Sequence, residues 1–337
     1  MRTWKRSASR LRTHTRRSEE GTLSGPVYKV GDPAPPPLPR RSEAEAMARW
    51  QGDKPVVSIL CPTYQHVDFI EDALRGFLGQ DTDFPFEILV RDDASTDGTA
   101  EIVRDYAERY PNIIRALPET ENRYSEVKPL QALGPMVRGE FIAICQGDDY
   151  WIDPTFLAKA VARIRQEGAS VVAVLGGAYI VKGEFIVGLE WRHRGKWNWS
   201  LPARSLLYRN VITVPHIEHA FGDNVLAIEL QRAGDIVHLN ELGAVYRRHA
   251  GGVVAGLAAG DIHPLKAASN VSIALHLARA GDLDLAVKYQ DRAIQKIAWM
   301  LKDYGVVPKN PPSGVALALD RVLQRLRSVA RAALHGR

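Results

Sequence analysis

Hydrophobic residues in the first half of the chain follow two alternating patterns. Short runs of consecutive apolar residues, bounded by proline or turn-forming residues, are typical of strands buried on both faces of a sheet. Apolar residues spaced three or four apart predict helices instead. Strands are predicted over 56–61, 86–90, 113–117 and 141–145, and helices over 69–78 and 99–110. This order implies a parallel sheet with crossover helices, so we expect an α/β fold beginning at about Lys54.

The second half of the chain has a less regular pattern. Two apolar runs within 170–188 flank Lys182-Gly183, which predicts a β-hairpin. Apolar spacing over 265–304 predicts two helices joined at Gly281-Asp282, and 317–334 combines an apolar stripe with arginines. A short helix is expected over 225–230 and a strand over 236–239. We therefore predict an α/β domain over 54–255 with halves 54–150 and 151–255, a helical hairpin over 262–305 and a basic amphipathic helix over 314–337.

The basic character of the chain is concentrated at its N-terminus. The formal net charge is +5, but residues 1–54 hold 12 Lys or Arg and 6 Asp or Glu, whereas the remainder holds 32 and 33. A nucleic-acid-binding domain would be basic where it folds, so no nucleic-acid partner is expected. Five prolines between Pro33 and Pro39 predict that residues 1–53 form a disordered or extended arm. Within it, Ser42 and Glu45 predict the capped start of a short helix.

Cysteine content and hydropathy bear on the cellular location. Cys61 and Cys145 lie in apolar runs, and two buried free thiols are typical of a reducing compartment. The chain lacks both an uninterrupted apolar stretch of about 18 residues and the apolar segment of a secretory signal. A cytoplasmic protein is therefore expected. Its basic arm could contact an anionic membrane at the inner face of the cell membrane, and the C-terminal stripe packs either there or on the body of the protein.

Polar residues follow three of the predicted strands at the point where each strand ends. Pro62-Thr63-Tyr64 follows the first strand, Asp92-Asp93 the second and Gly147-Asp148-Asp149 the last. Ligands of open parallel sheets bind beyond the carboxyl ends of the strands, so these segments predict one shared crevice. Paired carboxylates there suit a hard cation, Mg²⁺ or Mn²⁺, that also binds substrate phosphates. The alternative is that the acids serve only as turn residues and helix caps.

Motifs of several other phosphate-binding folds are missing from the sequence. The chain has no Walker-type phosphate loop, and no Gly-x-Gly-x-x-Gly follows the first predicted strand. This disfavours a nicotinamide dehydrogenase. A sugar nucleotidyltransferase would need a glycine-rich, arginine-containing first loop, which Pro62-Thr63-Tyr64 does not supply.

Three segments, taken in order and with their spacing, resemble bacterial family 2 glycosyltransferases of the GT-A fold. They are Val57–Gln65 (VSILCPTYQ), Glu87–Thr99 (EILVRDDASTDGT) and Gly139–Trp151 (GEFIAICQGDDYW). Phe221-Gly222-Asp223 and Tyr246–Val253 (YRRHAGGV) are similar to later parts of family members. The resemblance implies a Rossmann-like, mostly parallel central sheet flanked by helices. It also implies an enzyme that moves a sugar from a nucleoside-diphosphate sugar to an acceptor hydroxyl.

The resemblance implies a donor site at the first two strand ends. Pro62, Thr63 and Tyr64 would line the nucleotide base and ribose. Asp93 would contact the uracil or ribose of a UDP-sugar, the donor expected, with Asp92 supporting the turn.

The third strand end would hold the diphosphate and the cation. Asp148 would face the ribose or the donor sugar, and Asn122-Arg123 would reach the base or sugar. Asp149 would bind Mn²⁺ or Mg²⁺ on the diphosphate, with His249 as a second metal ligand or a diphosphate contact. A surface or packing role for His249 is the alternative. The neighbouring pair Arg247-Arg248 contacts the diphosphate or lies on a solvated face.

The resemblance further implies an inverting reaction, in which a base takes the proton of the acceptor hydroxyl. Asp223 is the expected catalytic base and Glu218 the substitute, although Asp223 also suits a helix N-cap. Trp191, Trp197 and Trp199 either flank an acceptor sugar or pack in the core. The acceptor is expected to be a saccharide or a lipid-linked glycan. The alternative to an enzyme is a non-catalytic module that binds a nucleotide or glycan on the same fold.

Overall fold

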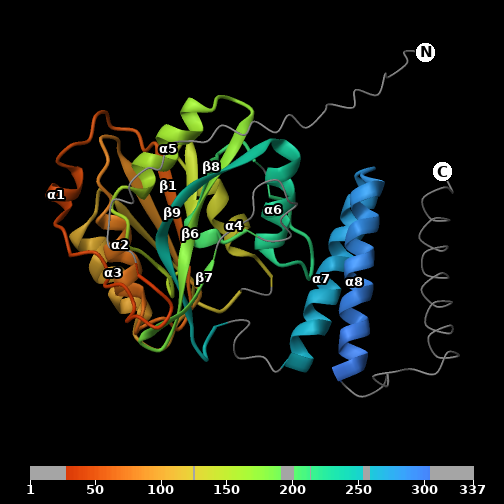
Figure 1. Ribbon diagram of the computed structural model, residues 1–337. Helices are drawn as coiled ribbons and strands as arrows, with labels where there is room; N and C mark the ends of the chain where they lie inside the picture. Colours follow the sequence, from red (N-terminus) through yellow and green to blue (C-terminus); the bar gives the residue numbers. More distant parts are fainter. Residues whose placement is uncertain (1–27, 124–125, 191–200, 213, 253–258, 304–337) are drawn as a thin grey trace, which may run out of the picture.

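The computed structural model describes residues 28–123, 126–190, 201–212, 214–252 and 259–303 (Figure 1). Within these residues nine strands form one sheet of order β3-β2-β1-β4-β8-β6-β9-β5, with β7 paired to β6. The strands are β1 (Val57–Thr63), β2 (Phe86–Asp92), β3 (Ile114–Pro118), β4 (Phe141–Ile144), β5 (Tyr150–Trp151), β6 (Val171–Lys182), β7 (Phe185–Glu190), β8 (Leu206–Arg209) and β9 (Asp235–Arg248).

The N-terminal half of the sheet is parallel, as the alternation of strands and helices predicts. β1 lies between β2 and β4, and β3 flanks β2, all with parallel pairing. These strands are apolar runs because both faces of the sheet are covered, and Ile59, Leu89 and Ala143 are almost fully buried. The second half of the sheet is mixed. β8 runs antiparallel to β4 and β6, while β6 and β9 are parallel.

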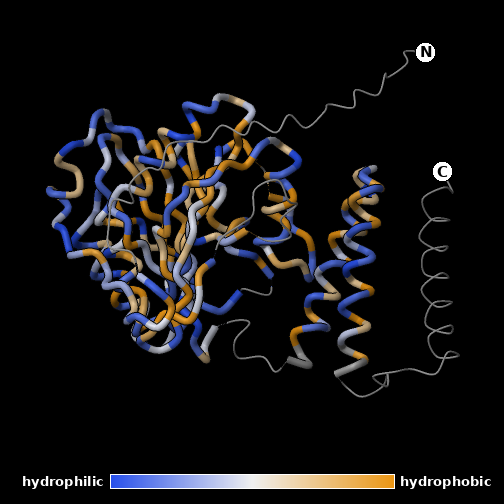
Figure 2. Tube along the Cα trace, in the orientation of Figure 1, coloured by the Kyte–Doolittle hydropathy of each residue, from blue (hydrophilic) through white to orange (hydrophobic). Residues whose placement is uncertain are grey.

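Helices cover both faces of this sheet. The α-helices are α1 (Glu43–Met47), α2 (Ile70–Leu78), α3 (Thr99–Arg109), α4 (Pro129–Leu133), α5 (Phe156–Gln166), α6 (Gly222–Ala233), α7 (Ala259–Arg279) and α8 (Leu283–Asp303). α2, α3 and α5 supply one apolar core and α4 and α6 the other, with the sheet between them. Figure 2 shows hydrophobic residues concentrated among the central strands.

The predicted helical hairpin is confirmed as α7 and α8, joined through Gly281 with φ 81°. It stands beside α6 at one end of the molecule (Figure 1). A small apolar cluster joins the three helices, with Val225 and Ile228 of α6 against Leu277 and Tyr289 of the hairpin. The hairpin therefore fixes α6, the helix whose first turn contains the expected base. Among the described residues, no helix is long and apolar enough to span a membrane.

The proline-rich part of the N-terminal arm is extended where the structure describes it, one of the two forms expected, and residues 28–53 pack along the domain. The backbone amides of Gly31 and Ala34 each donate to a backbone carbonyl in β7 or just before it, both at 2.8 Å. The Pro35 carbonyl accepts from the Tyr150 hydroxyl at 2.5 Å. The proline-rich stretch is extended and can therefore lie along the sheet. The predicted helix is present as α1, with a complete capping box at Ser42.

In the second half of the chain, some elements were not predicted, and one strand is longer than predicted. The hairpin predicted within 170–188 is confirmed as β6 and β7, but β5 and β8 were not predicted. The strand expected over 236–239 extends over all of β9, so the Arg247-Arg248 pair belongs to its end and not to a loop. The basic helix expected over 314–337 and the tryptophans at 191, 197 and 199 lie outside the described residues. The predicted domain boundaries remain predictions.

A buried carboxylate joins β2 to the chain before β4. Glu87 is 1% exposed, and its carboxylate accepts from Ser58 Oγ at 2.6 Å, Arg138 Nε at 2.7 Å and the Arg138 amide at 2.9 Å. Burial alone would raise the pKa of Glu87, but the hydrogen bonds from Arg138 and Ser58 outweigh it and lower that pKa. Glu87 therefore stabilises the fold as an anion.

Glu87→Gln is expected to lower the free energy of unfolding by about 2–3 kcal/mol at pH 7, because a charged acceptor in a buried network is lost. A lowered folded-state pKa gives stability above the unfolded-state pKa, about 4.3, that disappears as pH falls. The difference between wild type and variant should therefore shrink below about pH 4.3 in urea unfolding. Glu101→Gln, at an exposed pair with Arg104, is the control and should change stability by less than about 1 kcal/mol. Equal effects of the two changes would contradict this account.

Candidate functional site

The ends of three parallel strands bring the predicted polar segments together. Thr63 lies opposite Asp92 in the pairing of β1 with β2, and the Asp93 amide donates to the Thr63 carbonyl at 3.0 Å. On the other side of β1, the Gly147 amide donates to the Pro62 carbonyl at 3.0 Å. A Cβ at Gly147 would lie 2.6 Å from Thr63 Oγ1, so a larger residue would force the chain after β4 away from β1.

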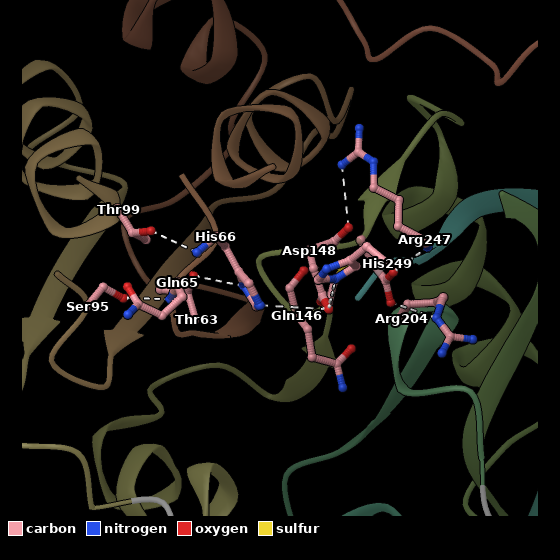
Figure 3. Close-up of polar contacts among 12 residues, drawn as sticks. Thr63, Gln65, His66, Ser95, Thr99, Gln146, Asp148, Arg204, Arg247 and His249 are labelled. Carbon is pink, nitrogen blue, oxygen red and sulfur yellow. Dashed lines mark hydrogen bonds and ion pairs between the residues drawn. The ribbon is translucent and has the colours of Figure 1, made fainter. Parts of the chain in front are cut away.

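The loops after β1 and β2 hold each other in a strained conformation. Gln65 has φ 57° and Ala94 φ 63°, a region that residues other than glycine adopt only at a cost. The Gln65 amide donates to Ser95 Oγ at 2.9 Å (Figure 3). The Gln65 side chain also forms hydrogen bonds with Thr96. Asp92 accepts from the Ser95 amide and hydroxyl at 3.0 and 2.6 Å. Asp92 thus holds the turn and does not point a free carboxylate into the crevice.

Asp93 presents an unpaired buried oxygen. Its Oδ1 accepts from Arg91 at 2.9 Å and from the Arg123 amide at 3.1 Å. Its Oδ2 is buried and has no hydrogen-bond partner among the described residues. Buried polar atoms are nearly always paired, so Oδ2 is a candidate acceptor for a ligand. Arg123 contributes its backbone here, because its side chain extends outward to Glu126 at 3.1 Å.

Pro62, Thr63 and Tyr64 lie at the same edge of the sheet, where β1 ends. Thr63 is 3% exposed, and its hydroxyl lies 3.1 Å from Nδ1 of His66. Tyr64, just after the strand, is 43% exposed. An exposed aromatic ring can stack on a planar base.

Asp148 is the centre of a cluster with two histidines. Its Oδ2 lies 3.2 Å from His249 Nε2 and 3.7 Å from His66 Nε2, and the two imidazoles approach it from different strand ends (Figure 3). Burial alone would raise the pKa of Asp148, but the hydrogen bond from His249 and the charges of both histidines lower it. The bond to Asp148 is also the main cause that raises the pKa of His249. Asp148 is therefore an anion, and its side chain is 18% exposed.

Asp149 points away from this cluster and into the protein. It is 2% exposed, its Oδ2 accepts from Arg204 Nε at 2.8 Å, and its Oδ1 accepts from the Arg247 amide at 2.9 Å. Burial raises the pKa of Asp149 to about 7, although the charge of Arg204 acts in the opposite direction. Arg204 also pairs with Glu190 and lies over the Tyr246 ring, 3.9 Å from its centroid. The metal ligand expected at Asp149 thus has both oxygens engaged in the fold.

The residues around Asp148 fit a divalent cation. Ligand atoms of His66, Asp148 and His249 all lie within 4.8 Å of one another. A buried Gln146 Oε1, two residues before Asp148, has no hydrogen-bond partner among the described residues. One carboxylate and two imidazoles form a donor set that first-row divalent metals accept. Of these three residues, His66 was not singled out from the sequence. Its one signal was its position just beyond the first predicted strand.

The basic pair after Tyr246 is divided between two roles. Arg247 pairs with Asp72 and lies over Tyr150, 4.2 Å from the ring centroid, so its guanidinium is committed to the fold. His249 lies against Phe69 with ring centroids 4.5 Å apart. Phe69 thus holds the imidazole beside Asp148. Arg248 is exposed at the end of β9, and its guanidinium lies 5.8 Å from the Tyr246 ring centroid.

The expected catalytic base lies at the start of α6. Asp223 is exposed in the first turn of this helix, where a carboxylate is also favoured by the helix dipole. The Phe221 amide, just before it, donates to the buried Ser269 hydroxyl of α7 at 3.1 Å. The substitute, Glu218, is 82% exposed and pairs with His219 at 3.3 Å. His219 has φ 61°, so the backbone of the turn before α6 is also strained.

Comparison with known proteins agrees with this architecture. A family described as glycosyl transferase family 2 matches residues 58–221. The uncharacterized protein Rv1520 of Mycobacterium tuberculosis is 34% identical over 214 residues, which cover 58% of this chain and 60% of that protein. The poly(ribitol-phosphate) beta-N-acetylglucosaminyltransferase TarS of Staphylococcus aureus is 33% identical over 120 residues, 35% of this chain and 20% of that protein.

A solved structure has the same fold. The crystal structure of S. aureus TarS 1-349 in complex with UDP-GlcNAc has a TM-score of 0.52 and 21% identity, covering 73% of this chain and 71% of that chain. The chain spans about 60% of the length of the first curated relatives it matches. The matched segment contains β2, β4 and nearly all of β1, whose ends carry the candidate site. By its sequence motifs and this match, the segment 58–221 is a glycosyltransferase family 2 segment, and the chain has the GT-A fold.

Proposed function

We propose that the chain is a metal-dependent, inverting glycosyltransferase that moves a sugar from a nucleoside-diphosphate sugar to an acceptor hydroxyl. The observation that carries the proposal is the set of polar side chains gathered at the ends of β1, β2 and β4. It combines the unpaired buried oxygen of Asp93 with the cluster of Asp148 and His249. One group can recognise a nucleotide, and the other can hold a cation on its phosphates, both within a family 2 domain.

The cation would be held by Asp148 and His249, and not by Asp149. Asp148 faces the two histidines, whereas Asp149 is bonded to Arg204 and to the Arg247 backbone. When bound, Mn²⁺ or Mg²⁺ supplies positive charge that stabilises the leaving diphosphate. Asp149 then has a positioning role, because its bonds to η2 (Ala203–Ser205) and β9 fix the strand end that carries His249.

The nucleotide would lie over the first two strand ends. Asp93 Oδ2 would accept a hydrogen bond from the base or ribose, and the open face of Tyr64 would stack on the base. The loop fastened by Gln65, Ser95 and Asp92 is already in place before a ligand binds, which lowers the entropic cost of binding. A UDP-sugar is the proposed donor, which accords with the UDP-GlcNAc complex of TarS.

Asp223 is the proposed base that accepts the proton of the acceptor hydroxyl. Its exposure in the first turn of α6 leaves the carboxylate accessible from solvent, where an acceptor arrives. The acceptor proposed is a saccharide or lipid-linked glycan of the cell surface, since the relative TarS is named for transfer to a poly(ribitol-phosphate). The enzyme would act in the cytoplasm, with its basic ends at the membrane.

A thermal-shift screen of nucleoside diphosphates and nucleotide sugars, with and without Mn²⁺, tests the proposal. At 100 times its dissociation constant, a ligand stabilises the folded state by about 2.7 kcal/mol. We expect one nucleoside diphosphate and its sugars to raise the unfolding temperature, and to do so much more with Mn²⁺ present. An unchanged unfolding temperature with every nucleotide and either metal condition would refute it.

A further inference from the structure

His66 occupies a position between two strand ends that its hydrogen bonds do not explain. Its side chain is 12% exposed, and its Nε2 is directed at Asp148 Oδ2 across 3.7 Å (Figure 3). That separation is longer than a hydrogen bond, so the two groups face each other without one. The imidazole of His249 approaches the same carboxylate oxygen at 3.2 Å. Two imidazoles thus converge on one carboxylate.

The orientation of His66 is fixed from both ends. Its amide donates to Thr99 Oγ1 at 2.8 Å, and its Nδ1 lies 3.1 Å from Thr63 Oγ1. With Nδ1 occupied by the Thr63 hydroxyl, the atom left facing Asp148 is Nε2. Metal-binding histidines are commonly held in this way, with the other ring nitrogen bonded to a nearby oxygen. The two residues that fix His66 come from β1 and from the start of α3, so its place does not depend on a mobile loop.

The separation of the three ligand atoms suits a single small cation. They all lie within 4.8 Å of one another. Ligands at about 2.1 Å from a common ion are at most about 4.2 Å apart, so only a small closing movement is needed. Three protein ligands leave further coordination positions of a six-coordinate ion for phosphate oxygens and water.

We propose that His66 is a third protein ligand of the cation, so that the protein binds the metal through two imidazoles and one carboxylate before the nucleotide arrives. The inference rests on the proposed function for the role of the cation, but its claim about metal binding can be tested separately. Three protein ligands do not need a diphosphate to complete a stable site. Mg²⁺ prefers an all-oxygen shell, whereas first-row transition metals, Mn²⁺ and Co²⁺ among them, accept imidazole more readily than Mg²⁺ does. The site should therefore select these metals over Mg²⁺.

Direct metal titration of the nucleotide-free full chain tests the proposal. Free Mn²⁺ gives an electron paramagnetic resonance signal that disappears on binding, and Co²⁺ and Mg²⁺ can compete with it. We expect the wild type to bind one Mn²⁺ and to prefer it over Mg²⁺. His66→Ala should weaken Mn²⁺ binding by about 10-fold or more. His219→Ala is the matched control, because that histidine is 68% exposed and pairs with Glu218 outside the cluster.

A conservative change separates ligation from a structural role. His66→Gln keeps a polar side chain beside Thr63 but replaces the imidazole by an oxygen donor. We expect it to lower the ratio of Mn²⁺ to Mg²⁺ affinity, a shift that loss of packing would not produce. The inference is overturned if wild type binds no Mn²⁺ without nucleotide, or if both His66 variants match the wild type while His249→Ala loses binding. Failure of the proposed function would appear differently, as absence of any response to nucleotides in a protein that still binds Mn²⁺.

Discussion

Asp148→Asn is expected to abolish metal-dependent nucleotide binding while the protein stays folded. Asp148 is the carboxylate that both histidines approach, and the variant removes its charge without changing its size. In this variant, nucleoside diphosphate with Mn²⁺ should no longer raise the unfolding temperature. The circular dichroism spectrum should be unchanged. Sugar transfer should fall to background in the same preparation.

The adjacent Asp149→Asn is the control, and its expected result is of a different kind. Asp149 is buried against Arg204, and breaking a buried ion pair by removing one partner destabilises a protein by about 3–5 kcal/mol. This variant should unfold at lower denaturant concentration, yet its folded fraction should still bind Mn²⁺. If Asp149→Asn lost the metal while stability was unchanged, and Asp148→Asn kept it, the assignment of the two carboxylates would be reversed.

Asp223→Asn is expected to reduce turnover by about 10²–10⁴-fold, the usual contribution of a general base. Nucleotide and metal binding should be unchanged, because Asp223 lies on α6 and not at the strand ends. Steady-state transfer and the thermal shift, measured on one preparation, separate the two effects. Stability should change little at an exposed side chain.

Glu218→Gln is the matched control for the base. Glu218 lies in the turn before α6 and is 82% exposed. We expect this variant to keep wild-type turnover. Loss of turnover in Glu218→Gln with normal turnover in Asp223→Asn would move the base to Glu218.

The crevice could be predicted from the sequence because parallel strands align their carboxyl ends. Apolar runs predicted β1, β2 and β4. Because these strands are parallel, the polar residues after each run lie at the same edge of the sheet. The roles of Asp148 and Asp149 could not be separated in this way. Consecutive residues after a strand point in different directions, and the direction depends on packing partners. Here that partner is Arg204, which is distant in sequence and carries no recognisable motif.

Elements whose stability comes from tertiary contacts were missed. β8 has four residues and β5 has two, so neither forms a clear apolar run, and each exists because β4, β6 or β9 supplies hydrogen bonds. The packing of residues 28–53 was missed for the same reason. Their proline content disfavours a core of their own, but Pro35 and Ala34 dock on a sheet that is already formed. His66 was overlooked because its ligand-like orientation depends on Thr63 and Thr99.

Release of nucleoside diphosphate from a panel of nucleotide sugars tests the central claim most directly. The full chain would be incubated with Mn²⁺, each donor and the lipid and polysaccharide fraction of bacterial cells as acceptor. We predict that at least one donor is turned over with sugar appearing in the acceptor fraction, and that Asp148→Asn and Asp223→Asn both abolish this. A nucleotide sugar that binds tightly yet is never turned over, with every acceptor fraction tried, would instead indicate a non-catalytic binding module and contradict the account.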